Sequence, residues 1–276
     1  TNPDLREGYE AVFGPLPDMS DSTRFPARAR PMADDATHAD HLAWESMTAD
    51  DQARATRVFV HVTKALGAFQ RTMRTAETPV DRYVAAYKAG DEAAMDAALS
   101  AEARQGLGLF IGEGRCHLCH SGALMSNLEF HSVGLGRRPW LTEDDRGRYD
   151  GITALRAHEF NAASPWSDAP DGEAAARIDR LVQTTEQLGI FKTPGLRAVS
   201  TSAPYMHGGH FDTLTQVVEH YNELDEVITI GHVETFMEPR GWDEAQVASL
   251  VAFLEALGAE PADPSVLAPP DAPLPP

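Results

Sequence analysis

Both cysteines of the chain lie in one short stretch, Cys116-His117-Leu118-Cys119-His120, and a histidine follows the second cysteine at once. This Cys-x-x-Cys-His spacing is the attachment signature of a c-type haem. Two thiols one helical turn apart can bond to the two vinyl groups of the porphyrin, and the next residue then brings an imidazole to the iron. The sequence therefore predicts that Cys116 and Cys119 anchor a haem and that His120 is its proximal ligand.

Three other uses of this stretch fit the sequence less well. A structural zinc site takes four Cys or His ligands in two pairs, and the sequence has no second Cys-x-x-Cys. A thioredoxin-type redox pair follows a buried strand, whereas residues 103–110 have the pattern of a helix. A disulfide between residues three apart is strained and closes almost no loop. We therefore favour the haem interpretation.

Length and charge limit the remaining classes. A chain of 276 residues is long enough for one large domain or two ordinary ones. Its formal net charge of −19 argues against nucleic acid and against an anionic membrane surface as partners. The sequence contains no run of about 18 apolar residues, so it predicts no membrane-spanning helix. No signal peptide is visible, but covalent haem is attached outside the bacterial cytoplasm, so we expect a periplasmic protein whose leader is not part of this sequence.

Helical periodicity dominates the sequence and predicts an all-α fold in which any strands are short. Predicted helices cover residues 2–13, 48–73, 91–110 with an interruption near Ser100, 214–224 and 243–257. Thr48 and Asp243 have the character of N-caps, and the last helix should pack against the helix before the haem motif. The stretches 15–47 and 121–176 read as long loops, residues 78–83 as a break, and residues 261–276 as a disordered, proline-rich tail.

Some polar side chains could complete the haem site. Arg146 and Arg148 could bind the haem propionates, because a guanidinium pairs with a carboxylate through two hydrogen bonds; solvent exposure explains them equally well. Met206 lies in a Pro-Tyr-Met stretch like that of small electron-transfer cytochromes, and it is a candidate for the sixth iron ligand. Packing against the porphyrin edge is its alternative role.

The order of six short stretches along the chain carries further information about its family. They are residues 60–72 (VHVTKALGAFQRT), 79–83 (PVDRY), 108–110 (GLF), 191–197 (FKTPGLR), 203–207 (APYMH) and 217–221 (VVEHY). Together with the haem motif, they resemble the bacterial di-haem cytochrome c peroxidase family, including its MauG-type branch. The resemblance extends from about Asn2 to Gly258, and the order of the stretches is far more specific than the haem motif alone.

The resemblance implies a domain arrangement. Members of that family have two cytochrome c-like domains, each with its own Cys-x-x-Cys-His, and the single motif here matches the second. Residues 1–95 would then be the helical end of a first cytochrome c-like domain, and residues 96–260 the second domain with its covalent haem. A first haem, its distal ligand and the acidic catalytic residue would lie before Thr1, so no catalytic residue is assigned in this chain. Either the chain is a fragment of a longer enzyme, which we favour, or it is a one-haem relative.

The resemblance also implies roles for individual residues. The family's electron-transferring peroxidases place a methionine on the second haem, whereas the MauG-type branch places a tyrosine there, and the matching position is Tyr221. We favour Tyr221 over Met206 as the distal ligand. Arg197 in the FKTPGLR stretch is assigned to the same haem site. The family binds a calcium ion between its domains, partly through backbone oxygens of the segment that matches Ser202 and Pro204.

These assignments imply a periplasmic, peroxidase-type haem oxidoreductase. Hydrogen peroxide would react at a first haem outside this sequence, and the haem held here would share or relay electrons. An electron-donor protein or an oxidised protein substrate would be the partner. The alternative is a one-haem electron-transfer cytochrome that uses His120 and Met206. The sequence does not name the donor, the substrate or the oligomeric state.

Overall fold

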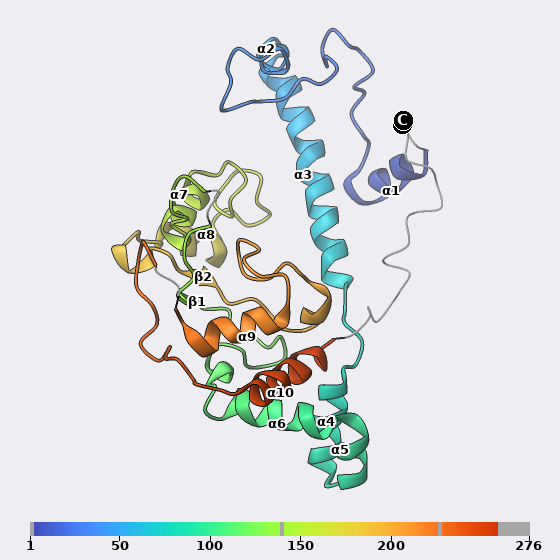
Figure 1. Cartoon of the computed structure of the whole chain (residues 1–276). Coiled ribbons are helices and arrows are strands. Elements are labelled where there is room, and N and C mark those ends of the chain that lie inside the picture. Colours follow the sequence, from blue (N-terminus) through green and yellow to red (C-terminus); the bar gives the residue numbers. More distant parts are fainter. Residues whose placement is uncertain (1–2, 139–140, 226–227, 259–276) are drawn as a thin grey trace. The chain divides into compact units, whose positions relative to one another are not determined.

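The computed structural model describes residues 3–138, 141–225 and 228–258, and the architecture is mostly helical (Figure 1). The chain divides into two compact units between Met73 and Arg74. The predicted boundary between residues 95 and 96 separates two cytochrome c-like domains. A division into compact units does not test which of these domains a segment belongs to, so this boundary stays a prediction. The predicted tail at 261–276 lies outside the described residues.

The described residues of the first unit form three helices. They are α1 (Pro3–Phe13), α2 (Ala39–Glu45) and α3 (Ala49–Thr72). α1 ends at Gly14, whose φ of 82° suits glycine, and the Thr48 side chain caps α3 by accepting a hydrogen bond from the Asp51 amide, as predicted. The prediction of a loop throughout 15–47 was wrong, because α2 lies within it. This helix has only seven residues, too few to show a helical period, and the His38 side chain caps it.

The second unit contains the haem motif. In chain order its elements are α4 (Pro79–Ala89), α5 (Glu92–Ala98), α6 (Ala101–Ile111), η1 (Cys116–Leu118), β1 (Phe130–His131), α7 (Arg148–Ala157), α8 (Glu173–Asp179), η2 (Thr185–Gln187), β2 (Phe191–Lys192), η3 (Val199–Thr201), α9 (Leu214–Glu223) and α10 (Glu244–Glu255). None of the described helices of either unit combines the length and apolar character that crossing a bilayer requires.

The stretch predicted as a break at 78–83 is the beginning of a helix. Thr78 and Asp81 form a capping box, in which each side chain accepts a hydrogen bond from the other residue's backbone amide, and Pro79 occupies the first turn of α4. The proline that prevents continuation of a preceding helix also favours a new one, and the prediction weighed only the first effect.

The core of the second unit lies where α6 and α10 pack together (Figure 1). The rings of Phe110 and Phe253 have centroids 4.9 Å apart, and Phe253 is completely buried. Gly106 lets the two backbones approach closely, because a Cβ atom there would lie 2.9 Å from Cβ of Phe253. The predicted packing of the last helix against the helix before the haem motif is therefore confirmed.

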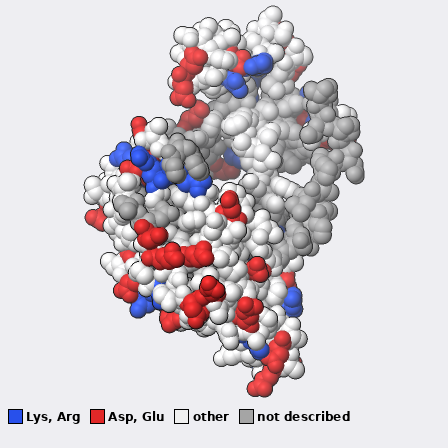
Figure 2. Space-filling model, viewed as in Figure 1, with Lys and Arg blue, Asp and Glu red and all other residues white. Residues whose placement is uncertain are grey.

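A two-stranded antiparallel sheet joins the segment after the haem motif to a later part of the chain. β1 pairs with β2, with Phe130 opposite Lys192 and His131 opposite Phe191. The predicted irregular stretch 121–176 also contains α7 and part of α8, so that prediction was wrong in part. Acidic side chains spread over α6, α9 and α10 in Figure 2, in keeping with the net charge of −19.

Candidate haem-binding site

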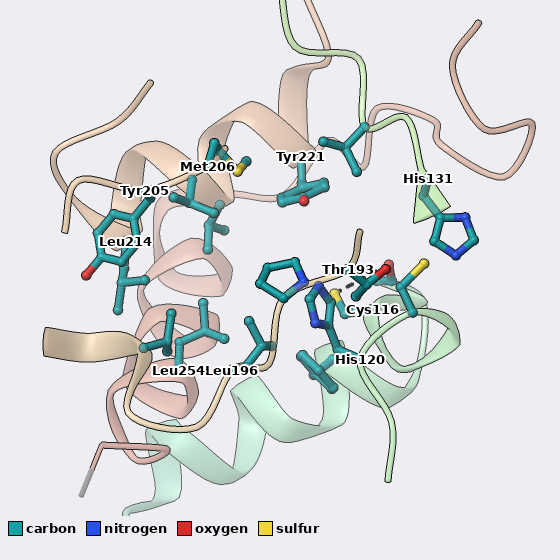
Figure 3. Close-up of a pocket in the computed structure, with 18 of the residues that line it drawn as sticks. Cys116, His120, His131, Thr193, Leu196, Tyr205, Met206, Leu214, Tyr221 and Leu254 are labelled. Carbon is teal, nitrogen blue, oxygen red and sulfur yellow. Dashed lines mark hydrogen bonds between the residues drawn. The ribbon is translucent and has the colours of Figure 1, made fainter. Parts of the chain in front are cut away.

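A cavity of about 400 Å³ opens beside α6, α9 and α10, a volume typical of sites for small molecules and cofactors. Its lining is mainly apolar. Lining side chains include Phe110, Leu196, Leu214, Val217, Val218, Leu250 and Leu254 (Figure 3). Several of these belong to the buried core of the unit, so the cavity extends into the core.

The three residues of the haem motif meet at this cavity. Cys116, Cys119 and His120 all line it, and the short η1 helix holds them together through a hydrogen bond of 2.9 Å from the His120 amide to the Cys116 carbonyl oxygen. Arg115 has a φ of 57° and turns the chain into η1. Both thiols are free, and burial raises the pKa of Cys116 to about 11. The structure thus brings together the groups predicted to attach a haem.

His120 is held in the form that a metal requires. Its Nδ1 lies 3.0 Å from the carbonyl oxygen of Met125, and because a carbonyl oxygen only accepts, this contact favours the tautomer that has the proton on Nδ1 and the lone pair on Nε2. Burial lowers the pKa of His120, which favours the neutral ring. Met125 has a φ of 53°, an uncommon conformation that aims its carbonyl group at the imidazole.

Two candidate distal ligands lie opposite His120. Figure 3 shows Tyr221, from α9, and Met206 along one side of the cavity, with His120 on the other. Burial raises the pKa of the Tyr221 phenol above its usual value, so its hydroxyl is protonated in the free chain. Met206 follows Tyr205, which is tied to Phe211 by a backbone hydrogen bond of 2.7 Å. The cavity therefore offers an oxygen and a sulfur donor on the same side.

The arginines predicted to bind propionates do not line this cavity. The guanidinium of Arg146 lies over the ring of Tyr149 and 3.2 Å from Asp150. Arg148 lies 3.8 Å above the Phe130 ring centroid. The propionate role of both stays a prediction.

Arg197 is committed to another contact. It donates two hydrogen bonds, of 2.9 and 2.7 Å, to the carboxylate of Asp81. Ser202 and Pro204 do line the cavity. Among the residues that the structure describes, no three His, Cys, Asp or Glu side chains cluster as for a metal ion, so the calcium assignment also stays a prediction.

Sequence reasoning missed one wall of the cavity. Residues 234–242, here called the strap, contribute Phe236, Met237, Arg240 and Trp242 to the lining. Glu234 accepts a hydrogen bond of 2.9 Å from His131. The strap has no regular secondary structure and no periodic pattern, so the sequence carries no signal for its position.

Comparison with known proteins gives the same family. No family model matches. The chain is 34% identical to the cytochrome-c peroxidase IdrP1 of Denitromonas iodatirespirans over 221 residues, which are 78% of this chain and 53% of that protein. It is also 34% identical over 202 residues to the methylamine utilization protein MauG of Methylorubrum extorquens, covering 73% of this chain and 45% of MauG. The chain is a relative of the bacterial di-haem cytochrome c peroxidases and MauG.

This family relationship confirms the resemblance seen in the sequence. A solved structure described as a MauG-like protein associated with microbial copper homeostasis matches 90% of this chain and 66% of that chain, with a TM-score of 0.51 and 21% identity, which supports the fold alone. The chain spans about half the length of the curated relatives that it matches.

The residues around the cavity fit a covalently bound haem. Two uncrosslinked thiols and an imidazole with a fixed tautomer lie at one side, and the remaining lining is mainly apolar. A flat apolar macrocycle would replace the missing part of the core, and the two thiols would hold it.

Proposed function

We propose that this chain is the second-haem part of a MauG-type di-haem peroxidase or oxidase. It would bind haem c through Cys116 and Cys119, with His120 and Tyr221 as the axial ligands. One observation carries the proposal: the three residues of the attachment motif line the same cavity as Tyr221, and His120 and Tyr221 lie on opposite sides of it (Figure 3).

The two axial residues would favour oxidised iron. When bound, the haem supplies one-electron oxidation and reduction. His120 contributes a neutral nitrogen donor whose orientation Met125 fixes. Tyr221 must lose its proton to bind, and the phenolate is an anionic oxygen donor that stabilises ferric and higher oxidation states. A thioether at the same place would raise the reduction potential instead. The choice of ligand therefore decides whether the site stores an oxidising equivalent or passes electrons readily.

The proposed partners follow from the relatives that are named cytochrome-c peroxidases. Hydrogen peroxide would be the oxidant in the intact protein, and an electron-donor protein or a protein side chain would supply electrons. The mainly apolar lining would lower the local dielectric around the bound group, which strengthens the electrostatic effect of the two ligands on it. A periplasmic location belongs to the same proposal.

Met206 supports a second candidate function. Because Met206 lines the same side of the cavity as Tyr221, the chain could instead hold a haem through His120 and Met206. Such a site suits a one-haem electron-transfer cytochrome with no peroxide chemistry of its own.

The ferric visible and near-infrared spectrum separates the two. We expect the intact mass to exceed that of the polypeptide by one haem and the methionine-to-iron charge-transfer band to be absent. Tyr221→Phe should alter the ferric spectrum, whereas Met206→Ala should not. Tyr205→Phe is the matched control, because Tyr205 lines the same cavity from another segment. A methionine band that disappears in Met206→Ala would contradict the proposal and support the electron carrier.

A further inference from the structure

Arg240 is the one half-buried cation that the strap contributes to the cavity wall. Its guanidinium donates a hydrogen bond of 3.1 Å to the Phe236 carbonyl oxygen. Within the described part of the chain, no carboxylate forms an ion pair with it. The carboxylate that shares this lining, Glu234, is already bonded to His131.

An anion would stabilise a guanidinium in this position. A half-buried guanidinium in the lining of a mainly apolar cavity is partly withdrawn from water, and a negative charge placed beside it offsets that cost. The other cationic side chains of the lining, Arg115 and Lys192, are exposed, so water satisfies them. Arg240 and Cys116, one attachment point of the proposed haem, line the same cavity.

The backbone around Arg240 is fixed by the helix that carries Tyr221. Asn222 accepts a hydrogen bond of 2.9 Å from the Arg240 amide through its own carbonyl oxygen. Its side chain then pairs with the backbone of Trp242 twice: it donates to the carbonyl oxygen at 3.0 Å and accepts from the amide at 2.7 Å. The Trp242 indole donates to Glu113 at 3.0 Å, three residues before Cys116. The strap around Arg240 is therefore bonded on one side to α9 and on the other to Glu113, just before the haem motif.

We propose that Arg240 binds a propionate carboxylate of the haem and that Asn222 is the positioning residue that holds it there. The inference rests on the proposed haem site but not on which distal ligand is used. It assigns the propionate contact to a residue that no sequence pattern marks, because the arginines that the sequence suggested have other partners. A guanidinium can pair with a carboxylate through two parallel hydrogen bonds, which fixes both the charge and the orientation of the ring.

Resonance Raman spectroscopy of the haem-loaded chain tests the proposal through the propionate bending band. Arg240→Gln should shift that band, because the carboxylate loses its strongest partner. Arg240→Lys keeps the charge but not the paired donors, so a smaller shift in the same direction is expected. Lys192→Gln is the matched control, since it removes an exposed positive charge from the same lining, and its band should match the unsubstituted protein.

Two further outcomes make the test decisive. Asn222→Ala leaves Arg240 intact but removes the two side-chain bonds that hold the strap, and its band should move towards that of Arg240→Gln. An unchanged band in Arg240→Gln, or an equal shift in Lys192→Gln, would overturn the assignment. If Arg240→Gln does not accumulate as a haem protein, the propionate bending bands of Arg240→Lys and Asn222→Ala test the proposal instead. Failure of the Tyr221 assignment is visible separately in the Tyr221→Phe spectrum, and failure of haem attachment in the intact mass.

Discussion

Gly106 is a residue at which a single added methyl group would disturb the packing of two helices. A Cβ atom there would lie 2.6 Å from the carbonyl carbon of Ser249 and 2.9 Å from Cβ of Phe253, so α6 and α10 would have to separate. We expect Gly106→Ala to lower the free energy of unfolding by about 1–3 kcal/mol, the usual cost of overpacking. Denaturant titration followed by circular dichroism measures this change.

Gly108 provides the matched control, because it lies one half-turn away in the same helix and no atom lies within 4 Å of a Cβ added there. Gly108→Ala should stabilise the chain by up to about 1 kcal/mol through helix propensity alone. Equal effects of the two substitutions would show that the close approach of α6 and α10 does not limit stability.

At the level of elements, Asp81 connects the start of α4 to the segment that follows β2. Its carboxylate accepts hydrogen bonds from the Thr78 amide and hydroxyl group and from the guanidinium of Arg197. The Arg197 guanidinium is the largest cause that holds the pKa of Asp81 well below its usual range. We expect Asp81→Asn to cost about 1–3 kcal/mol at neutral pH, as for a lost charged hydrogen bond.

The pH dependence of this loss has a definite sign. A carboxyl group whose pKa is lower in the folded chain stabilises the fold above its unfolded pKa of about 3.9, and that stabilisation disappears as the pH falls towards the folded value. The difference in unfolding free energy between the unsubstituted chain and Asp81→Asn should therefore be constant above about pH 5 and shrink below about pH 4. A difference that grows on acidification would contradict the assigned contact.

Elements with strong local signals are the ones that the sequence predicts correctly. Thr48 and Asp243 cap their helices as expected, because a cap depends on residues within one turn. The haem motif is likewise local, and its residues meet at one cavity. The strap is different. Hydrogen bonds from the backbone of Arg240 and Trp242 to Asn222 hold it beside the cavity, and no local spacing in the sequence encodes a pairing over such a distance along the chain.

At the scale of the whole molecule, the cavity places the proposed haem site against the core of the second unit. Core residues such as Val218, Leu250 and Leu254 line the cavity, so the part of each side chain that faces it has no protein atoms to pack against. Such residues forgo dispersion contacts, which a bound haem would restore. We expect the haem-loaded chain to melt at a higher temperature than the double variant Cys116→Ala/Cys119→Ala, as measured by scanning calorimetry.

The control for this prediction is production of both chains without haem supply. The two haem-free chains should then melt at nearly the same temperature, because the substitutions themselves remove little packing. Equal melting temperatures of the haem-loaded chain and the double variant would show that the cofactor does not complete the core.

The shared carboxylate of Asp81 also limits which sequences can keep this fold. One side chain serves both a helix cap and an arginine more than a hundred positions later, at distances that suit aspartate. A glutamate would move both contacts by the length of a methylene group, and a change at Thr78 or Arg197 alone would leave part of the carboxylate unpaired. We therefore expect Thr78, Asp81 and Arg197 to be retained or replaced together among relatives, as a covarying triplet that can be sought in any alignment of the family.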